Sequence, residues 1–207
     1  MDLLKKIFSK RTAPGAAEIR EAVRGKYREV AASAEGKFKY STGRTGAEAL
    51  KYDQSIIDAM PEGLIESFCG VGNPFSLGPV EAGQSVLDVG CGAGFDLITA
   101  GRLVGPEGRA SGIDLTPEMV EKARRYLETA GIAGEVKVAG CEELPFPDEE
   151  FDLVISNGVL NLSPEKEKCF AEILRVLKPG GRLQFADIVL KGDLPDEKAR
   201  SLDAWSD

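Results

Sequence analysis

Three glycines that alternate with small residues form the segment of this sequence with the clearest chemical meaning. Residues 86–95 read VLDVGCGAGF, so an apolar run containing Asp88 leads into Gly90, Gly92 and Gly94. Glycines at a turn let the backbone adopt positive φ and let a ligand approach without meeting a Cβ. The spacing is G-x-G-x-G, because Phe95 stands where a dinucleotide-binding loop has its third glycine. The segment therefore predicts a strand, a tight turn and a helix start that together bind a small ligand.

Asp88 lies two residues before this loop and indicates the charge of that ligand. A carboxylate there repels a pyrophosphate but attracts an ammonium group. S-adenosylmethionine (SAM) fits this requirement, because its amino-acid end is cationic and it carries no phosphate. We therefore expect SAM as the cofactor, with Asp88, Gly90 and Gly92 around its methionine end. A structural role for Asp88, accepting hydrogen bonds from backbone N–H groups of the turn, is compatible with this function.

Further cofactor contacts are expected where the later strands end. Asp114 closes the second predicted strand, where a carboxylate binds ribose hydroxyls in nucleotide-binding α/β units. Cys141 and Glu142 follow the third strand and are placed to flank an adenine, whereas Ser156 and Asn157 follow the fourth, beside the methionine part. The complete expected set is Asp88, Gly90, Cys91, Gly92, Asp114, Leu115, Cys141, Glu142, Ser156 and Asn157.

The sequence contains no histidine. This excludes a Ser-His-Asp triad, a Cys-His pair and an H-E-x-x-H metal site. Methyl transfer from a sulfonium does not need an imidazole, because the donor is already activated and the leaving group is a neutral thioether. A nucleophile with a free lone pair then requires alignment more than removal of a proton. We assign no residue as a general base.

The composition restricts the partners and the location of the protein. A formal charge of −8 argues against nucleic acid, whose phosphates require clustered Lys and Arg. No apolar run approaches the ~20 residues that span a bilayer, so we expect a cytoplasmic protein without a membrane span. Cys69, Cys91, Cys141 and Cys169 are far apart, which indicates neither a disulfide framework nor a metal site. The expected partner is a small-molecule methyl acceptor.

Strands and helices alternate regularly from Ser85 onward. Such alternation predicts an α/β fold with a doubly wound, Rossmann-like parallel sheet of about five strands. Ahead of it we expect helices near Ala16–Ala31 and Ala47–Met60, and we divide the chain into a helical lid, residues 1–80, and a cofactor-binding core, residues 81–207. The predicted strands are Ser85–Val89, Arg109–Asp114, Glu135–Ala139, Phe151–Ser156 and Arg182–Ile188, and the helices between them are Phe95–Val104, Pro117–Ala130 and Pro164–Leu177.

Several motifs together resemble the class I SAM-dependent methyltransferases. They are the glycine loop at residues 88–94, Asp114, LPFPD at 144–148 with Phe151-Asp152, and RVLKPGG at 175–181. The resemblance implies the strand order 3-2-1-4-5 and SAM as methyl donor. More closely, GVGNP at 70–74, VGPEG at 104–108 and ISNGVLNLS at 155–163 resemble the arsenite methyltransferase branch.

Two positions depart from that branch where its arsenic-binding cysteines lie. The family has a cysteine in G-C-G-[NS]-P and another in S-N-C-V-[IL]-N-L, whereas this chain has Val71 and Gly158. Trivalent arsenic binds through soft thiolates, which valine and glycine do not offer. Cys69 lies close to the Val71 position and is the candidate thiol for an acceptor site. The resemblance thus implies methyl transfer to a small soft nucleophile or small metabolite and argues against arsenite itself.

Other functions remain open at this point. One is a SAM-binding protein without turnover whose acceptor site is lost; another is a C- or O-methyltransferase for small molecules of the quinol or biosynthetic type. A nicotinamide oxidoreductase is disfavoured by Phe95 and Asp88. Formation of S-adenosylhomocysteine with a panel of acceptors separates the enzyme from the binding protein.

The sequence stops before the sheet implied by the resemblance is complete. That sheet has seven strands, and this sequence supplies five, so we expect strands 6 and 7 to be missing through a truncation after Asp207. A selenocysteine codon read as a stop would produce such an end, and a third family cysteine would lie just beyond it. Trp205 would then lack core partners. The last strand would be an unpaired edge through which two copies could form a homodimer.

Overall fold

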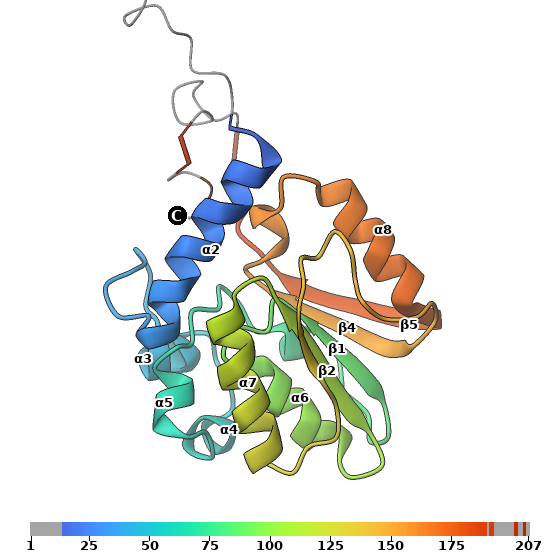
Figure 1. Cartoon of the computed structure of the whole chain (residues 1–207). Coiled ribbons are helices and arrows are strands. Elements are labelled where there is room, and N and C mark those ends of the chain that lie inside the picture. Colours follow the sequence, from blue (N-terminus) through green and yellow to red (C-terminus); the bar gives the residue numbers. More distant parts are fainter. Residues whose placement is uncertain (1–13, 190, 193–200, 203–204, 206–207) are drawn as a thin grey trace, which may run out of the picture.

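The computed structural model describes residues 14–189, 191–192, 201–202 and 205. Within this part of the chain, five strands form one parallel sheet in the order β3-β2-β1-β4-β5 (Figure 1). The Rossmann-like α/β fold and the strand order are therefore confirmed. The strands are β1 Ser85–Val89, β2 Arg109–Asp114, β3 Val136–Val138, β4 Phe151–Asn157 and β5 Leu177–Ala186.

Helices cover both faces of the sheet, as the alternation of elements predicts. Helices α6 (Phe95–Val104) and α7 (Pro117–Thr129) pack on one face, and α8 (Lys166–Val176) packs on the other (Figure 1). Successive side chains of a strand point to opposite faces. Leu153 of β4 accordingly joins the core cluster on the α6 side, and its neighbour Val154 joins the cluster on the α8 side.

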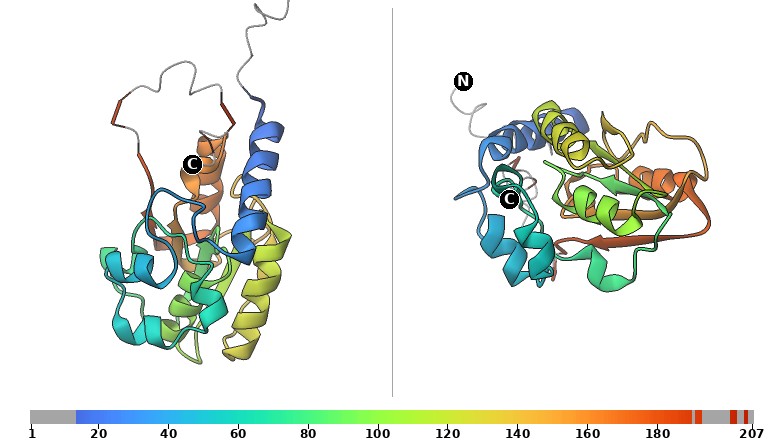
Figure 2. Two further views of the ribbon diagram at one scale, coloured as in Figure 1. Left: turned by 90° about the vertical axis from the view of Figure 1, so that its left-hand side faces the viewer. Right: turned by 90° about the horizontal axis from the view of Figure 1, so that it is seen from below.

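The N-terminal helices belong to the same hydrophobic core as the α6 face of the sheet. They are α2 Ala16–Ala32, α3 Gly43–Ala49, α4 Gln54–Asp58 and α5 Glu62–Ile65. Buried side chains from α2 to α5 form one cluster with those of α6 and α7. Helix α2 runs beside α7 (Figure 2), and Arg28 of α2 forms an ion pair of 2.9 Å with Glu118 of α7. Two 3-10 turns, η1 Pro74–Leu77 and η2 Leu160–Leu162, complete the elements described.

The single helix expected at Ala47–Met60 is wrong, because the chain breaks into α3 and α4. Lys51 adopts a positive φ of 60°, which ends α3. The side chain of Asp53 then accepts a hydrogen bond of 2.8 Å from the Ser55 N–H and starts α4. The break turns Tyr52 inward, where its hydroxyl donates a hydrogen bond to Asp96. A buried polar contact thus decides a local structure that apolar spacing alone does not reveal.

Strand β5 begins earlier and ends earlier than the expected Arg182–Ile188. Leu177 already pairs with Phe151, and the register then shifts so that Arg182 pairs with Leu153. The KPGG segment between them is an irregularity within the strand instead of a turn before it. Lys178 in this segment forms an ion pair of 2.9 Å with Asp152 of β4, which holds it against the sheet.

Strand β5 is an edge of the five-stranded sheet, as expected, and apolar side chains are exposed near it. Phe185 of β5 is 39% exposed and contacts Phe170 of α8 edge to face at 6.0 Å. Trp205 is half-buried, and the Lys166 ammonium lies 5.0 Å from its ring centroid. Among the described residues, no helix combines the length and the apolar character that a membrane crossing requires.

Candidate functional site

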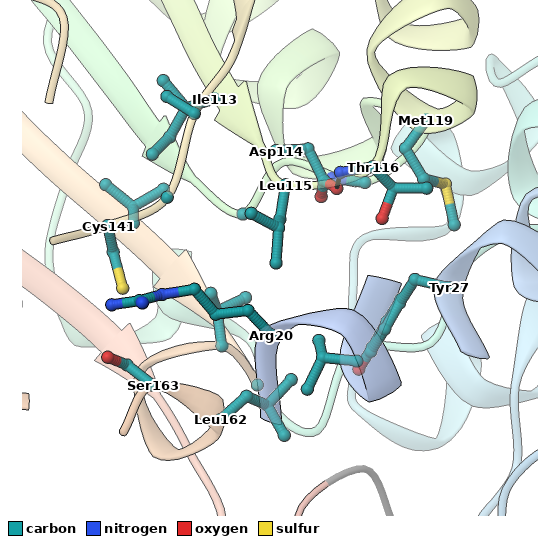
Figure 3. A pocket seen from close by; sticks show the side chains of 18 of the residues that line it. Arg20, Tyr27, Ile113, Asp114, Leu115, Thr116, Met119, Cys141, Leu162 and Ser163 are labelled. Atoms are coloured by element: carbon teal, nitrogen blue, oxygen red, sulfur yellow. Dashed lines mark hydrogen bonds between the residues drawn. The ribbon is translucent and has the colours of Figure 1, made fainter. Parts of the chain in front are cut away.

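A pocket opens at the carboxyl ends of β1, β2 and β4, beneath α2. Figure 3 shows Arg20 and Tyr27 reaching into it from α2, opposite Asp114 and Leu115 at the end of β2. Its open space is about 790 Å³, part of which is solvent at the mouth. A second hollow of about 400 Å³ adjoins it and shares Cys69, Gly90, Gly92 and Asn157 with it.

The glycine loop forms the floor between the two hollows. Gly90 and Gly92 have φ values of +78° and +52°, a region that favours glycine. A Cβ on Gly90 would also overlap the side chain of Val159. The backbone N–H groups of Gly90 and Cys91 both donate to the carbonyl oxygen of Ile113, at 2.9 and 2.8 Å. The loop is thus fixed to the end of β2, and its predicted turn geometry is confirmed.

Asp114 lines the larger hollow and also holds the glycine loop. Its Oδ2 accepts a hydrogen bond of 2.9 Å from the Gly92 N–H, and its Oδ1 accepts one of 2.8 Å from the Thr116 N–H. Burial raises the pKa of this carboxyl group, and the backbone hydrogen bonds offset part of that rise. Each carboxylate oxygen has a further lone pair for a ligand hydroxyl. The geometry therefore suits the ribose contact expected of Asp114.

Asp88 lines the smaller hollow as a buried carboxylate with an unused oxygen. The residue is 2% exposed, and its Oδ2 has no hydrogen-bond partner within the described part of the chain. Burial, followed by the charges of Asp96 and Asp114, raises the pKa of Asp88 well above its usual range. A buried anion of this kind is costly unless a cation or a donor meets it. The hollow is therefore suited to a positively charged group.

Asn157 positions the loop at residues 70–72 with every polar atom of its side chain. Its Oδ1 accepts hydrogen bonds from the N–H groups of Val71 and Gly72, at 2.8 and 3.1 Å. Its Nδ2 donates to the Gly72 carbonyl at 2.8 Å, to Asp96 Oδ2 at 3.0 Å and to the Tyr52 hydroxyl at 3.1 Å. Asn157 lines both hollows, but its side chain is occupied in holding their walls together.

Asp96 lines the smaller hollow and is bonded to Tyr52, and sequence reasoning singled out neither residue. Asp96 lies in the first turn of α6, two residues after Gly94, and the Tyr52 hydroxyl donates to its Oδ1 at 2.7 Å. Burial raises the pKa of Asp96 to about 6, although hydrogen bonds from Asn157 and Tyr52 oppose the rise. A second acid so soon after Asp88 was the available signal, but only the fold brings Tyr52 to it.

Replacement of Tyr52 by phenylalanine is expected to destabilise the chain by about 1.5–3 kcal/mol at neutral pH, because a buried carboxylate loses a donor. The loss should shrink as the pH falls below about 6, since protonated Asp96 no longer needs that donor. Urea unfolding at several pH values measures both effects. Tyr40→Phe is the control: its hydroxyl donates to the neutral Cys69 carbonyl, so its effect should not depend on this titration. A Tyr52→Phe loss that is constant across the range would contradict the interpretation.

The residues expected at an adenine, Cys141 and Glu142, lie at the other end of the larger hollow. Ser163 donates a hydrogen bond of 2.7 Å to Glu142 Oε1, and Arg20 reaches the same oxygen from α2 at 3.3 Å. Arg20 also pairs with Glu165. In Figure 3 the Arg20 side chain extends toward Cys141 and Ser163. Helix α2 is therefore tied to the rim of the pocket by a charged side chain that the sequence analysis did not single out.

The other candidates differ in their access to the pocket. Leu115 lines the larger hollow, and Cys91 lines the smaller one. Ser156 lines neither hollow: it is buried, and its hydroxyl donates to the Val89 carbonyl at 2.9 Å. Cys69 lines both, but burial raises the pKa of its thiol to about 12. At neutral pH Cys69 is thus a protonated thiol.

The two positions at which the resemblance implies cysteines lie next to each other. A Cβ on Gly158 would be 3.3 Å from both Cγ atoms of Val71. Gly158 has a φ of +73°, and it lines the larger hollow beside Asn157. The structure therefore brings together the two positions that the resemblance singled out. They carry the isopropyl side chain of Val71 and the hydrogen atom of Gly158, and neither can bind arsenic.

Comparison with known protein families supports the fold. A family model described as a methyltransferase domain matches residues 80–206, which is more than half of the chain. The chain belongs to this family. Its sheet order and its glycine loop are those of a class I, Rossmann-like methyltransferase fold, as the motifs indicate.

The individual relatives include arsenite methyltransferases and quinone-biosynthesis C-methyltransferases. An arsenite methyltransferase of Halobacterium salinarum is 36% identical over 195 residues, covering 87% of this chain and 50% of that protein. A ubiquinone/menaquinone biosynthesis C-methyltransferase of Marinomonas is 41% identical over 125 residues, covering 59% of this chain and 48% of that protein. A solved arsenic(III) S-adenosylmethionine methyltransferase from Chlamydomonas reinhardtii has a TM-score of 0.58 and 31% identity, covering 76% and 53% of the two chains. This chain spans about half the length of these relatives.

Proposed function

We propose that this chain binds SAM in the two joined hollows and transfers its methyl group to a small acceptor. The unused, buried Oδ2 of Asp88 carries the proposal, because it provides an anion for the ammonium of the methionine end. Asp114 would accept the ribose hydroxyls, and Cys141 and Glu142 would flank the adenine. The two hollows meet at Gly90 and Gly92, and the open space where a Cβ on Gly92 would lie would let a ligand pass across the loop.

The residues around the pocket would act by binding, orienting and excluding water. Bound SAM supplies an activated methyl group on a sulfonium. Asn157 would keep the 70–72 loop fixed over the methionine end, and α2 would close the pocket through Arg20 and Tyr27. The described helices before residue 80 would thus serve as the lid. This chain offers alignment and desolvation, which suit a nucleophile that needs no deprotonation.

A small, soft or carbon nucleophile is the proposed class of acceptor. Val71 and Gly158 leave an apolar wall where the arsenite branch has thiols, and the Cys69 thiol is protonated at neutral pH. The likeness to a quinone-biosynthesis C-methyltransferase makes a small-molecule C-methyltransferase the second candidate. Binding of SAM without turnover is the alternative if the acceptor site is incomplete.

Two measurements test the proposal in order. Saturating SAM should raise the melting temperature, by the free energy that ligand binding adds to folding. S-adenosylhomocysteine should then accumulate when the chain is given SAM with one of a panel of thiols, quinol-type compounds and arsenite. Stabilisation by NADH but not by SAM would overturn the binding proposal. Stabilisation by SAM without product from any acceptor would favour the non-catalytic alternative.

A double substitution, Val71→Cys with Gly158→Cys, is expected to create binding of trivalent arsenic. The two side chains would face each other across the contact that Val71 now fills, and paired thiolates bind arsenic more tightly than one. We expect the double variant to bind an arylarsenical at least about tenfold more tightly than either single variant. Titration of each chain with the arylarsenical measures its affinity. The thermal stability of each chain is the control. Equal binding by the double variant and the unaltered chain would show that the departures at these positions do not govern arsenic binding.

The oligomeric state, the partner and the location of the protein are predicted as well. We propose that the exposed edge of β5, with Phe185 and the neighbouring Phe170, supports pairing of two copies. A small molecule, not nucleic acid, is the proposed partner, in keeping with the net charge of −8. The cytoplasmic location stays a prediction from composition. Sedimentation analysis of the chain, with Phe185→Lys as the disrupting variant, tests the pairing.

A further inference from the structure

Two cysteines and a carboxylate that are separated in sequence meet beside the adenine end of the pocket. The sulfur atoms of Cys141 and Cys169 and a carboxylate oxygen of Glu142 lie within 4.8 Å of one another. Cys141 and Glu142 lie in the loop after β3, whereas Cys169 comes from α8. Cys169 is fully buried, and Cys141 is 7% exposed and lines the larger hollow. The cluster therefore adjoins the pocket through Cys141 and Glu142.

The chemistry of the three side chains suits a soft cation. Cysteine binds metal ions as the thiolate, so closing on an ion would release the protons of Cys141 and Cys169. Glu142 adds a carboxylate oxygen to the two sulfur atoms of the cluster.

We propose that Cys141, Cys169 and Glu142 bind a soft divalent cation of the Zn²⁺ or Cd²⁺ class. Two thiolates and a carboxylate supply three ligands of a tetrahedral site, and the fourth position would face the pocket. Zn–S bonds of about 2.3 Å place two sulfur atoms roughly 3.8 Å apart. The cluster, whose ligand atoms lie within 4.8 Å, would need to contract by no more than about 1 Å to close on an ion.

The bound ion has a consequence for the proposed cofactor. Glu142 Oε1 now accepts hydrogen bonds from Ser163 and Arg20, and coordination would draw this carboxylate away from Arg20. An ion at Cys141 would also narrow the space assigned to the adenine. The ion and SAM should therefore weaken each other's binding. This competition, unlike the binding of the ion, rests on the proposed function.

Titration of the reduced chain with Co²⁺, in the absence of SAM, tests the site. Co²⁺ reports thiolate ligation through a charge-transfer absorption, and Zn²⁺ should displace it. We expect Cys141→Ser and Cys169→Ser to weaken Co²⁺ binding at least about tenfold and to remove most of the absorption. Cys69→Ser is the matched control, because Cys69 lines the same pocket outside the cluster and should leave the absorption unchanged. An absorption that is missing in the unaltered chain, or that survives both cluster substitutions, would overturn the proposal.

A measurement on the unaltered chain covers the case in which Cys169→Ser fails to fold. Zn²⁺ should slow alkylation of Cys141 at least about tenfold while leaving that of Cys69 unchanged, as followed by peptide mass spectrometry. Equal alkylation of Cys141 with and without Zn²⁺ would contradict the site. Addition of SAM to the Co²⁺-loaded chain then tests the competition. Metal binding that is insensitive to SAM would leave the ion site intact and count against the placement of the adenine.

Discussion

Replacement of Asp88 by asparagine is expected to lower SAM affinity at least about 100-fold, because breaking a buried ion pair costs about 3–5 kcal/mol. The carboxylate is 2% exposed, and its Oδ2 has no partner within the described residues. It is therefore free to meet the ammonium group. The asparagine side chain has nearly the same shape, so the loss would reflect charge and not packing.

The same substitution should raise the stability of the chain without ligand. Burial and the charges of Asp96 and Asp114 raise the folded-state pKa of Asp88 above its value in the unfolded chain. At a pH above both values the ionised carboxylate therefore weakens folding, and this penalty is relieved as the pH falls through the folded pKa. Asparagine removes the charge and can donate toward the neighbouring carboxylates. The gain in stability should grow as the pH rises and should shrink on acidification.

Thermal unfolding with and without SAM measures both effects in one series. Asp58→Asn is the control, since Asp58 is paired with Arg44 at 2.8 Å and its pKa is lowered. The control should keep full SAM binding and should not stabilise the chain. An Asp88→Asn chain that binds SAM within a few-fold of the original would overturn the proposed role of Asp88.

The sequence predicted the parts of the fold that depend on local pattern. The boundaries of β1, β2 and α6 were predicted correctly, because apolar runs, glycines and helical spacing act over a few residues. Lys51 and the KPGG segment were not, because their conformations depend on distant partners. Tyr52 turns inward to reach Asp96, and Lys178 is held by Asp152 of another strand.

The candidate site likewise has features that follow from local sequence pattern and features that depend on distant residues. The glycine loop and Asp114 could be placed from spacing, and the predicted turn brings them together through the Gly92 N–H. Arg20 could not, since nothing in the sequence connects α2 with the loop that contains Glu142. Asn157 was predicted as a ligand contact and lines both hollows, and the spacing did not reveal that its hydrogen bonds also hold the 70–72 loop. Contacts that join remote segments are the ones that sequence reasoning did not predict.

Replacement of Asn157 by aspartate is expected to destabilise the chain by about 3 kcal/mol or more at neutral pH. The change exchanges the Nδ2 donor for an acceptor of the same shape. That atom donates to the Gly72 carbonyl, to Asp96 Oδ2 and to the Tyr52 hydroxyl. In the variant, the hydrogen bonds to Gly72 and Asp96 become contacts between acceptors, and the contact with Asp96 is between like charges. The Tyr52 hydroxyl cannot offset both losses, because its proton is already donated to Asp96.

The loss should depend on pH with a defined sign. Asp96 has a folded pKa of about 6, and a carboxylate at position 157 would raise it further. Below that pKa, protonated Asp96 becomes a donor to the new side chain, so the destabilisation should fall on acidification. Urea unfolding on both sides of this pKa measures the change. Asn73→Asp is the matched control in the adjoining loop, because its side-chain oxygen caps η1 and its amide donates to the neutral Lys51 carbonyl, so its effect should not depend on the titration of Asp96. A loss that is the same on both sides of the pKa would show that Asn157 acts by packing alone, without the hydrogen bond to Asp96.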